Sequence, residues 1–152
     1  MPMIDIYTPD HLIPVDANSQ LGTELALAVL RAEGVESPGP FHLNNTAVFI
    51  HRLSSEAIHT GSTPSAKNIR IQVITPPGAL NREGQRRFTR EATEIVARIT
   101  GDETQATRTW VILTEAAEGG WGINGTAFGQ EEFAALAAQA AAASLGSASD
   151  QT

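Results

Sequence analysis

The chain has 152 residues and a formal net charge of -7. This length suits one ordinary domain, and the acidic balance argues against a nucleic-acid partner. The absence of cysteine excludes thiol nucleophiles, disulfides and thiolate metal sites. The sequence has neither a signal-like start nor a run of about 18 apolar residues, so we expect a cytoplasmic protein without a membrane partner.

The first predicted elements are a strand, a helix and a second strand. Residues 3–7 alternate between apolar and polar side chains, which predicts a short strand that Pro9 closes. Apolar residues then recur at helical spacing from Leu21 to Ala32, and Gly34 follows where a helix-ending glycine is expected. Residues 46–53 are rich in β-formers and predict the second strand.

The same order of elements recurs 67 residues later. Residues 69–73 alternate like the first strand, a second helix is predicted between Asn81 and Gly101, and residues 108–115 predict a fourth strand. The shift places Ile4 and Ile6 on Ile71 and Val73. The sequence therefore predicts a duplicated β-α-β unit, with halves at about residues 1–61 and 62–128.

We expect an α+β fold in which the two β-α-β units form one four-stranded mixed sheet. Right-handed crossovers place both helices on one face of that sheet, and the bare opposite face predicts oligomerisation. Residues 119–128 predict a glycine-rich hairpin; they match G-x-G-x-x-G, but no further strand follows to complete a nucleotide site. Residues 129–152 are expected to form a C-terminal helix, with a frayed tail from Gly146 onward.

Few residues stand out as candidates for chemistry. The four histidines lack the spacing of a zinc site, so we expect no metal. Arg82 belongs to the first turn of the second helix, where a guanidinium and free backbone N–H groups together suit a carboxylate. A solvated helix face is an equally good interpretation of Arg82, and the better one for Arg87 and Arg90.

Pro2 allows two interpretations. It fits as the first residue of a strand, where its missing N–H costs no ladder hydrogen bond. Alternatively, removal of Met1 exposes a secondary amine, which burial and nearby arginines would keep neutral and therefore basic. Ile69 occupies the corresponding position of the second half, so the strand itself does not require a proline.

Three features together resemble the tautomerase superfamily: Met1-Pro2 before an alternating strand, the doubled β-α-β unit, and the segment ILTEAAEGGWGINGTAF. The last is the most specific, because a Thr-Glu pair followed by Gly-x-aromatic-Gly-Ile-x-Gly is typical of the family. The resemblance covers about residues 2–128. It implies a fused, two-unit member that works without a cofactor and assembles as a homotrimer.

The resemblance also implies a function. Members use the amino-terminal proline as general base or acid and hold a substrate carboxylate with arginines. Transferred here, this implies a tautomerase or isomerase of a small 2-oxo or unsaturated carboxylic acid. Its site residues would be Pro2 as the base, Arg82 and Arg108 on the carboxylate, Trp121 as a pocket wall, and Glu115 as a polar candidate.

Departures from the family pattern keep two alternatives open. No arginine follows the first strand, and Trp110 stands where an arginine of the last strand is expected. Residues 80–84 resemble the L-x-R-E-G motif of cis-3-chloroacrylic acid dehalogenase, although Gln85 replaces its next arginine. A hydratase or dehalogenase would need a residue that activates water, for which the candidates are His51, Asp5 and Tyr7. The other alternative is a non-catalytic trimeric member.

Overall fold

The structure is a computed structural model that describes the backbone of residues 1–149 and the side chains through Ala143. Two β-α-β units follow one another. The first contains β1 (Met3–Pro9), α1 (Asn18–Ala32) and β2 (Ala47–Leu53), and the second contains β3 (Ile69–Thr75), α3 (Arg82–Thr100) and β4 (Thr109–Glu115). The predicted order of strands and helices in both halves is confirmed.

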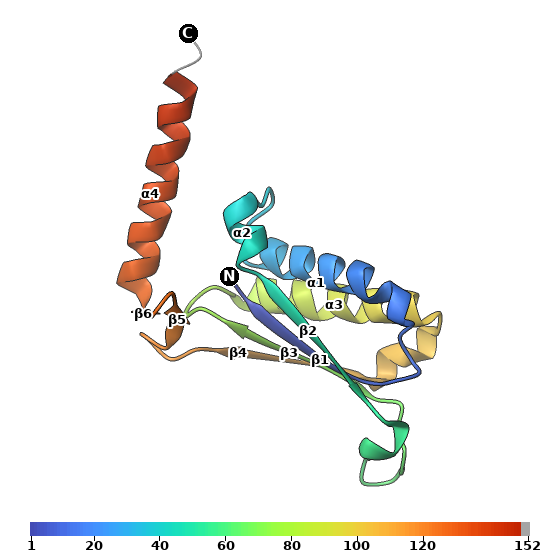
Figure 1. Ribbon diagram of the computed structural model, residues 1–152. Helices are drawn as coiled ribbons and strands as arrows, with labels where there is room; N and C mark the ends of the chain where they lie inside the picture. The colour runs from blue at the N-terminus through green and yellow to red at the C-terminus, as the bar shows by residue number, and fades with distance from the viewer. Residues whose placement is uncertain (150–152) are drawn as a thin grey trace.

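The four long strands form one mixed sheet in the order β2-β1-β3-β4. Strands pair parallel within each unit, and β1 and β3 pair antiparallel at the centre. The helices α1 and α3 cover the same face of this sheet (Figure 1). The predicted α+β architecture is therefore confirmed.

The central pairing has the symmetry expected of a duplicated chain. Ile4 lies opposite Val73, and Ile6 lies opposite Ile71. A shift of 67 residues exchanges these two pairs, and it maps Asp5 onto its own partner Gln72. The two halves are thus related by an approximate two-fold axis that passes between Asp5 and Gln72.

The core lies between the helices and the covered face of the sheet. It consists of alternate residues of β1 and β3 together with the apolar stripes of α1 and α3, as the spacing of these residues predicts. Both ends of α3 also agree with the sequence: the Asn81 side chain accepts a hydrogen bond from the Gly84 N–H at 2.8 Å, and Gly101 follows the last turn with a φ of 67°.

Two of the shorter elements lie near the start of β1. They are α2 (Pro40–Asn44), which was not predicted from the sequence, and the hairpin of β5 (Trp121–Ile123) and β6 (Thr126–Phe128). Short 3-10 helices, also not predicted, occupy other connections at Val15–Ala17, Ser55–Ala57 and Glu103–Arg108. Asn124 and Gly125 join the hairpin strands with φ angles of 50° and 76°, the left-handed values that a tight Asn-Gly hairpin turn requires.

The last helix, α4 (Gln130–Ser149), extends away from the body of the molecule (Figure 1). It continues through Ser149, so the predicted frayed tail is wrong for residues 146–149, into which the helix propagates from the alanine-rich residues before them. The rest of that prediction, residues 150–152, lies outside the described residues. None of the helices described up to Ser149 is long and apolar enough to cross a membrane.

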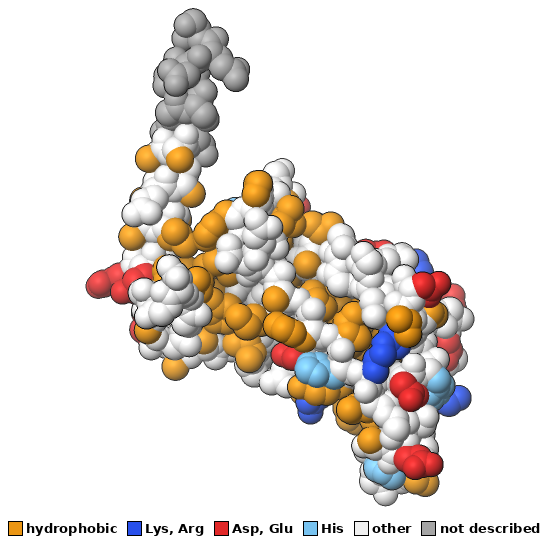
Figure 2. All heavy atoms as spheres, in the orientation of Figure 1, with side chains coloured by type: hydrophobic (Ala, Val, Ile, Leu, Met, Phe, Trp, Pro, Cys, Tyr) orange, Lys and Arg blue, Asp and Glu red, His pale blue; other side chains and the backbone are white. Residues whose placement is uncertain are grey.

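The face of the sheet opposite α1 and α3 is not covered by any element in the part of the chain that the structure describes. Its exposed large apolar side chains are Met3, Phe49, Trp110 and Ile112. In Figure 2, charged side chains are more frequent toward the end of the body away from α4, and hydrophobic ones nearer to it. An apolar sheet face of this kind is typical of a surface that a partner covers.

Candidate functional site

A cavity of about 530 Å³ lies beside the start of β1, and we call it the amino-terminal cavity. Its walls come from the end of α1, from α2, from the loop after β3 and from α4. The lining is mostly apolar. It consists of Met1, Glu33, Val35, Phe41, His42, Pro76, Pro77, Gly78, Ala79, Gln130, Phe133, Leu136, Ala137 and Ala140.

The amino terminus is buried at this cavity. The Met1 side chain is 5% exposed, and Pro2 behind it is buried. The Pro2 carbonyl accepts a hydrogen bond from the Ala47 N–H at 3.3 Å, which ties the start of β1 to β2. The terminal nitrogen of the chain is therefore held in place at the cavity wall.

The polar group next to this nitrogen is a carboxylate. Glu33 Oε2 lies 3.4 Å from the Met1 nitrogen, and the Glu33 side chain is 8% exposed. Burial raises the pKa of Glu33, and the positive amino terminus offsets part of that rise. The sequence analysis expected arginines beside the amine, but no arginine is found among the described residues that line the cavity.

Two buried polar atoms of the cavity residues are unsatisfied. Glu33 Oε1 and His42 Nδ1 have no hydrogen-bond partner among the described residues. A buried polar atom without a partner costs on the order of 1–3 kcal/mol. Such atoms are expected where a ligand or water supplies the missing bond.

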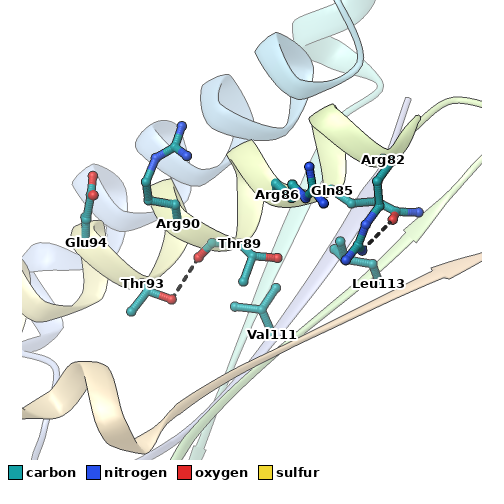
Figure 3. A pocket seen from close by; sticks show the side chains of 9 residues that line it. All are labelled: Arg82, Gln85, Arg86, Thr89, Arg90, Thr93, Glu94, Val111 and Leu113. Carbon is teal, nitrogen blue, oxygen red and sulfur yellow. Dashed lines mark hydrogen bonds between the residues drawn. The ribbon is translucent and has the colours of Figure 1, made fainter.

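A second, more open depression lies between α3 and the edge strand β4, and we call it the α3–β4 groove. Its volume is about 730 Å³. Arg82 lies at one end, where its Nη1 donates to Gln85 Oε1 at 3.2 Å above Leu113 (Figure 3). Arg90 and Glu94, farther along the helix, point away from β4. Arg82 makes no ion pair with any carboxylate in the described part of the chain.

The other predicted site residues are not gathered in one cavity of this chain. Glu115 ends β4, opposite Thr75, and so lies at the same end of the sheet as Pro2. Trp121 is buried in the hairpin. Arg108 precedes β4 at the opposite end, roughly 20 Å from Pro2 for a seven-residue strand. There its Nη2 donates to Asp102 Oδ2 at 2.9 Å.

The candidates for water activation cluster on the uncovered face of the sheet. His51 Nε2 lies 2.6 Å from Asp5 Oδ1, and the His51 ring stacks on Tyr7 with 4.4 Å between centroids. The Arg70 guanidinium covers the Tyr7 ring at 4.3 Å. This cluster does not line the amino-terminal cavity. No group of three or more metal-ligating side chains occurs in the part of the chain that the structure describes.

Comparison with known proteins identifies the fold. No protein-family model matches the sequence. No curated protein matches it either. Among solved structures, the symmetric trimer of a wild-type fused 4-OT matches with a TM-score of 0.68 and 14% identity, over 82% of this chain and 93% of that one. The chain has the tautomerase-superfamily fold.

Other structures with the tautomerase fold match about as well. Pt0534 inactivated by 2-oxo-3-pentynoate gives a TM-score of 0.69 and 17% identity, over 82% of this chain and 93% of that one. Macrophage migration inhibitory factor of Toxoplasma gondii gives a TM-score of 0.66 and 16% identity, over 83% of this chain and 99% of that one. N1, of the cis-3-chloroacrylic acid dehalogenase family, gives a TM-score of 0.65 and 14% identity, over 83% of this chain and 82% of that one.

Glu33, His42 and the α4 side chains were not predicted from the sequence as parts of the site. One signal was present: Glu33 follows the last turn of a predicted helix, where a negative charge opposes the helix dipole. An acidic residue at that point raises the question of its function. The α4 residues carried no comparable signal, because alanine-rich helices are common and their docking depends on the tertiary structure.

Proposed function

We propose that this protein is a tautomerase or isomerase that moves a proton within a small 2-oxo or unsaturated carboxylic acid. The observation that carries this proposal is that the buried amino-terminal residue, Met1, lines a mostly apolar cavity large enough for a small organic acid. Tautomerase-fold proteins of several kinds resemble the chain, which supports this class of chemistry over others.

In this proposal Pro2 is the general base, after Met1 has been removed. Its nitrogen then becomes a secondary amine at the wall of the amino-terminal cavity. Burial in mostly apolar surroundings favours the neutral and therefore basic form of this amine, whereas an ionised Glu33 beside it would favour the charged form. A buried base positioned next to its substrate contributes about 10²–10⁴ in rate.

Arg82, which lines the α3–β4 groove and not the amino-terminal cavity, is the proposed carboxylate ligand. It lies in the first turn of α3, at the same end of the sheet as Pro2, and its guanidinium has no described carboxylate to neutralise it. Glu115 and Trp121 belong to the same end and are proposed as a polar and an apolar wall. Arg108 takes part in this proposal only through a neighbouring subunit, because its own chain places it at the far end of the sheet.

The proposed assembly is a homotrimer. The uncovered sheet face supports an oligomer, and a fused 4-OT with this fold is described as a symmetric trimer. Such an assembly would also bring residues of one subunit to the site of another.

Two measurements test the proposed function. Intact-protein mass spectrometry shows whether Met1 is absent, and a retained Met1 contradicts every mechanism that uses the Pro2 amine. The rate of ketonisation of an aryl-pyruvate enol is then compared between the wild type and Pro2→Ala, which keeps a small second residue for methionine removal. We expect a loss of about 10²-fold or more in Pro2→Ala. Equal rates would support a non-catalytic binding protein instead.

A further inference from the structure

Glu33 occupies a position that folding stability alone does not favour. Its side chain is 8% exposed and follows the last turn of α1, at the C-terminal end of that helix. A carboxylate there is opposed by the negative end of the helix dipole and by the loss of hydration. One of its oxygens, Oε1, has no hydrogen-bond partner among the described residues.

Two glutamates near Glu33 have structural roles, because they form ion pairs with arginines. Glu36 lies three residues further on, is 63% exposed, and accepts a hydrogen bond from Arg87 at 2.9 Å. Glu91 accepts hydrogen bonds from both Arg31 and Arg87 on its two oxygens. Glu33 alone of these three is buried in a cavity with a free oxygen, so its position points to a ligand.

Met1 occupies the space between Glu33 and Pro2, the proposed base. The Met1 nitrogen lies 3.4 Å from Glu33 Oε2, and the Met1 carbonyl carbon is bonded to the Pro2 nitrogen. Ordinary backbone dimensions then limit the Pro2 nitrogen to within roughly 7 Å of that oxygen. Removal of Met1 would leave an opening of the size of one residue, with an amine on one side and a carboxyl group on the other.

We infer that Glu33 is the second proton-transfer group of the site, donating to the substrate atom opposite the one that Pro2 serves. The inference rests on the proposed function, since it needs a substrate in the place of Met1. The substrate class is an enolisable carbonyl compound whose two reacting atoms span the opening between the two groups.

The proton balance of the step is simple. The Pro2 nitrogen takes the proton of an enol hydroxyl, and the electrons of that O–H bond form the carbonyl. The electrons of the carbon–carbon double bond take the proton of the Glu33 carboxyl group and form a new C–H bond. Pro2 is left as an ammonium and Glu33 as a carboxylate, and a proton passed from the first to the second restores both.

The electrostatic setting of Glu33 suits a donor. Burial raises the pKa of its carboxyl group, which favours the protonated form that can donate. The charged group that faces it is the amino terminus, and His42 of α2 lines the same cavity. The other charges near the end of α1, on Arg31 and Arg87, are neutralised by Glu91 and Glu36.

The test is the pH profile of kcat/KM for aryl-pyruvate enol ketonisation in the wild type, Glu33→Gln and Glu36→Gln. We expect a bell-shaped profile in the wild type, because the base must be neutral and the acid must be protonated. Glu33→Gln should lose about 10²-fold in kcat/KM and the descending limb at high pH, since glutamine cannot donate a proton from a carboxyl group. Glu36→Gln, the matched control, should keep both limbs and a rate within about threefold of the wild type.

Failure of this inference differs from failure of the proposed function. An active wild type whose profile and rate are unchanged in Glu33→Gln would overturn the role of Glu33 and leave Pro2 in place. A wild type no faster than Pro2→Ala would overturn the proposed function and this inference with it.

A second variant covers the case in which Glu33→Gln does not fold. Glu33→Asp keeps a carboxylic acid but withdraws it by one methylene group. It should keep the bell shape with a kcat lowered by about 10-fold or more, because the proton must travel farther. A Glu33→Asp rate equal to that of the wild type would count against proton donation from this position.

Discussion

Gly84 of α3 lies directly against the main-chain carbonyl oxygen of Ala32 at the end of α1. A Cβ atom at position 84 would overlap that oxygen and would also press on the Leu80 side chain, at 3.2 Å. Leu80 itself is buried. Packing therefore explains two of the four residues that resemble the L-x-R-E-G motif, Leu80 and Gly84, but not the exposed Arg82.

The close approach predicts that Gly84→Ala is destabilising. Alanine is intrinsically the better helix residue by about 1 kcal/mol, but here it must push α3 away from a carbonyl group that cannot move freely. We expect a net loss of about 1–3 kcal/mol in the free energy of unfolding, measured by urea denaturation. Gly22→Ala in α1 is the matched control, because its Cβ would meet only Val48 at 3.9 Å. That variant should be neutral or more stable, and a Gly84→Ala protein as stable as Gly22→Ala would contradict the packing argument.

Glu91, which joins α1 to α3, is expected to contribute to the free energy of unfolding by an amount that depends on pH. Burial alone would raise its pKa, but the hydrogen bonds from Arg31 and Arg87 lower it below the usual 4.5. Because the folded pKa is the lower one, this stabilisation is present above about pH 4.5 and is lost as the pH falls through the folded pKa. Glu91→Gln should therefore lower the free energy of unfolding by about 1 kcal/mol at pH 7, and by progressively less as the pH falls.

Thermal unfolding across a pH series checks the Glu91 prediction. Glu94→Gln on the same helix is the control, because Glu94 makes none of the hydrogen bonds or ion pairs described for this chain. It should change stability by less than about 0.5 kcal/mol. A Glu91→Gln effect that stays constant from pH 7 to pH 3 would show that packing, and not the ion pairs, is responsible.

Arg82 should discriminate acids from their neutral analogues. If its guanidinium holds the substrate carboxylate, Arg82→Gln raises the KM of a 2-oxo acid by about 10–100-fold, the effect of one charged hydrogen bond. The KM of the corresponding methyl ester should hardly change. Steady-state kinetics on both compounds gives the comparison, with Arg90→Gln as the control, because Arg90 lies about 12 Å farther along α3 and its side chain points away from β4 (Figure 3). Equal KM values in the two variants would remove Arg82 from the site.

The uncovered sheet face should control assembly. Ile112 is 42% exposed there, in the middle of the edge strand β4. Ile112→Lys places a charge on a surface that must lose its water when subunits associate, so we expect dissociation into monomers. Val15→Lys is the control, because Val15 is 69% exposed and lies outside the sheet. Sedimentation equilibrium should give a trimer for the wild type and for Val15→Lys, and a trimeric Ile112→Lys protein would place the interface elsewhere.

Local chemistry made most of the fold predictable. The alternation of Ile4 and Ile6 and of Ile71 and Val73 specifies two strands with one buried face each, because the side-chain period of a strand is two residues. Asn81 and Gly101 mark the ends of α3, and Asn124-Gly125 marks the hairpin turn, since these residues have strong backbone preferences. The elements that escaped prediction are α2, the short 3-10 helices at Val15–Ala17, Ser55–Ala57 and Glu103–Arg108, and the end of α4.

The candidate site was less predictable, because it depends on distances between residues far apart in the chain. The sequence by itself determined that there are two β-α-β units, that their sheet has a bare face, and that Pro2 stands before the first strand. Only the tertiary structure decided that Glu33, 31 residues after Pro2, lies at the amino terminus, that Arg108 lies at the far end of the sheet, and that α4 walls the cavity. Periodicity and turn propensity act over a few residues, whereas the neighbours of a buried amine are set by how whole elements pack.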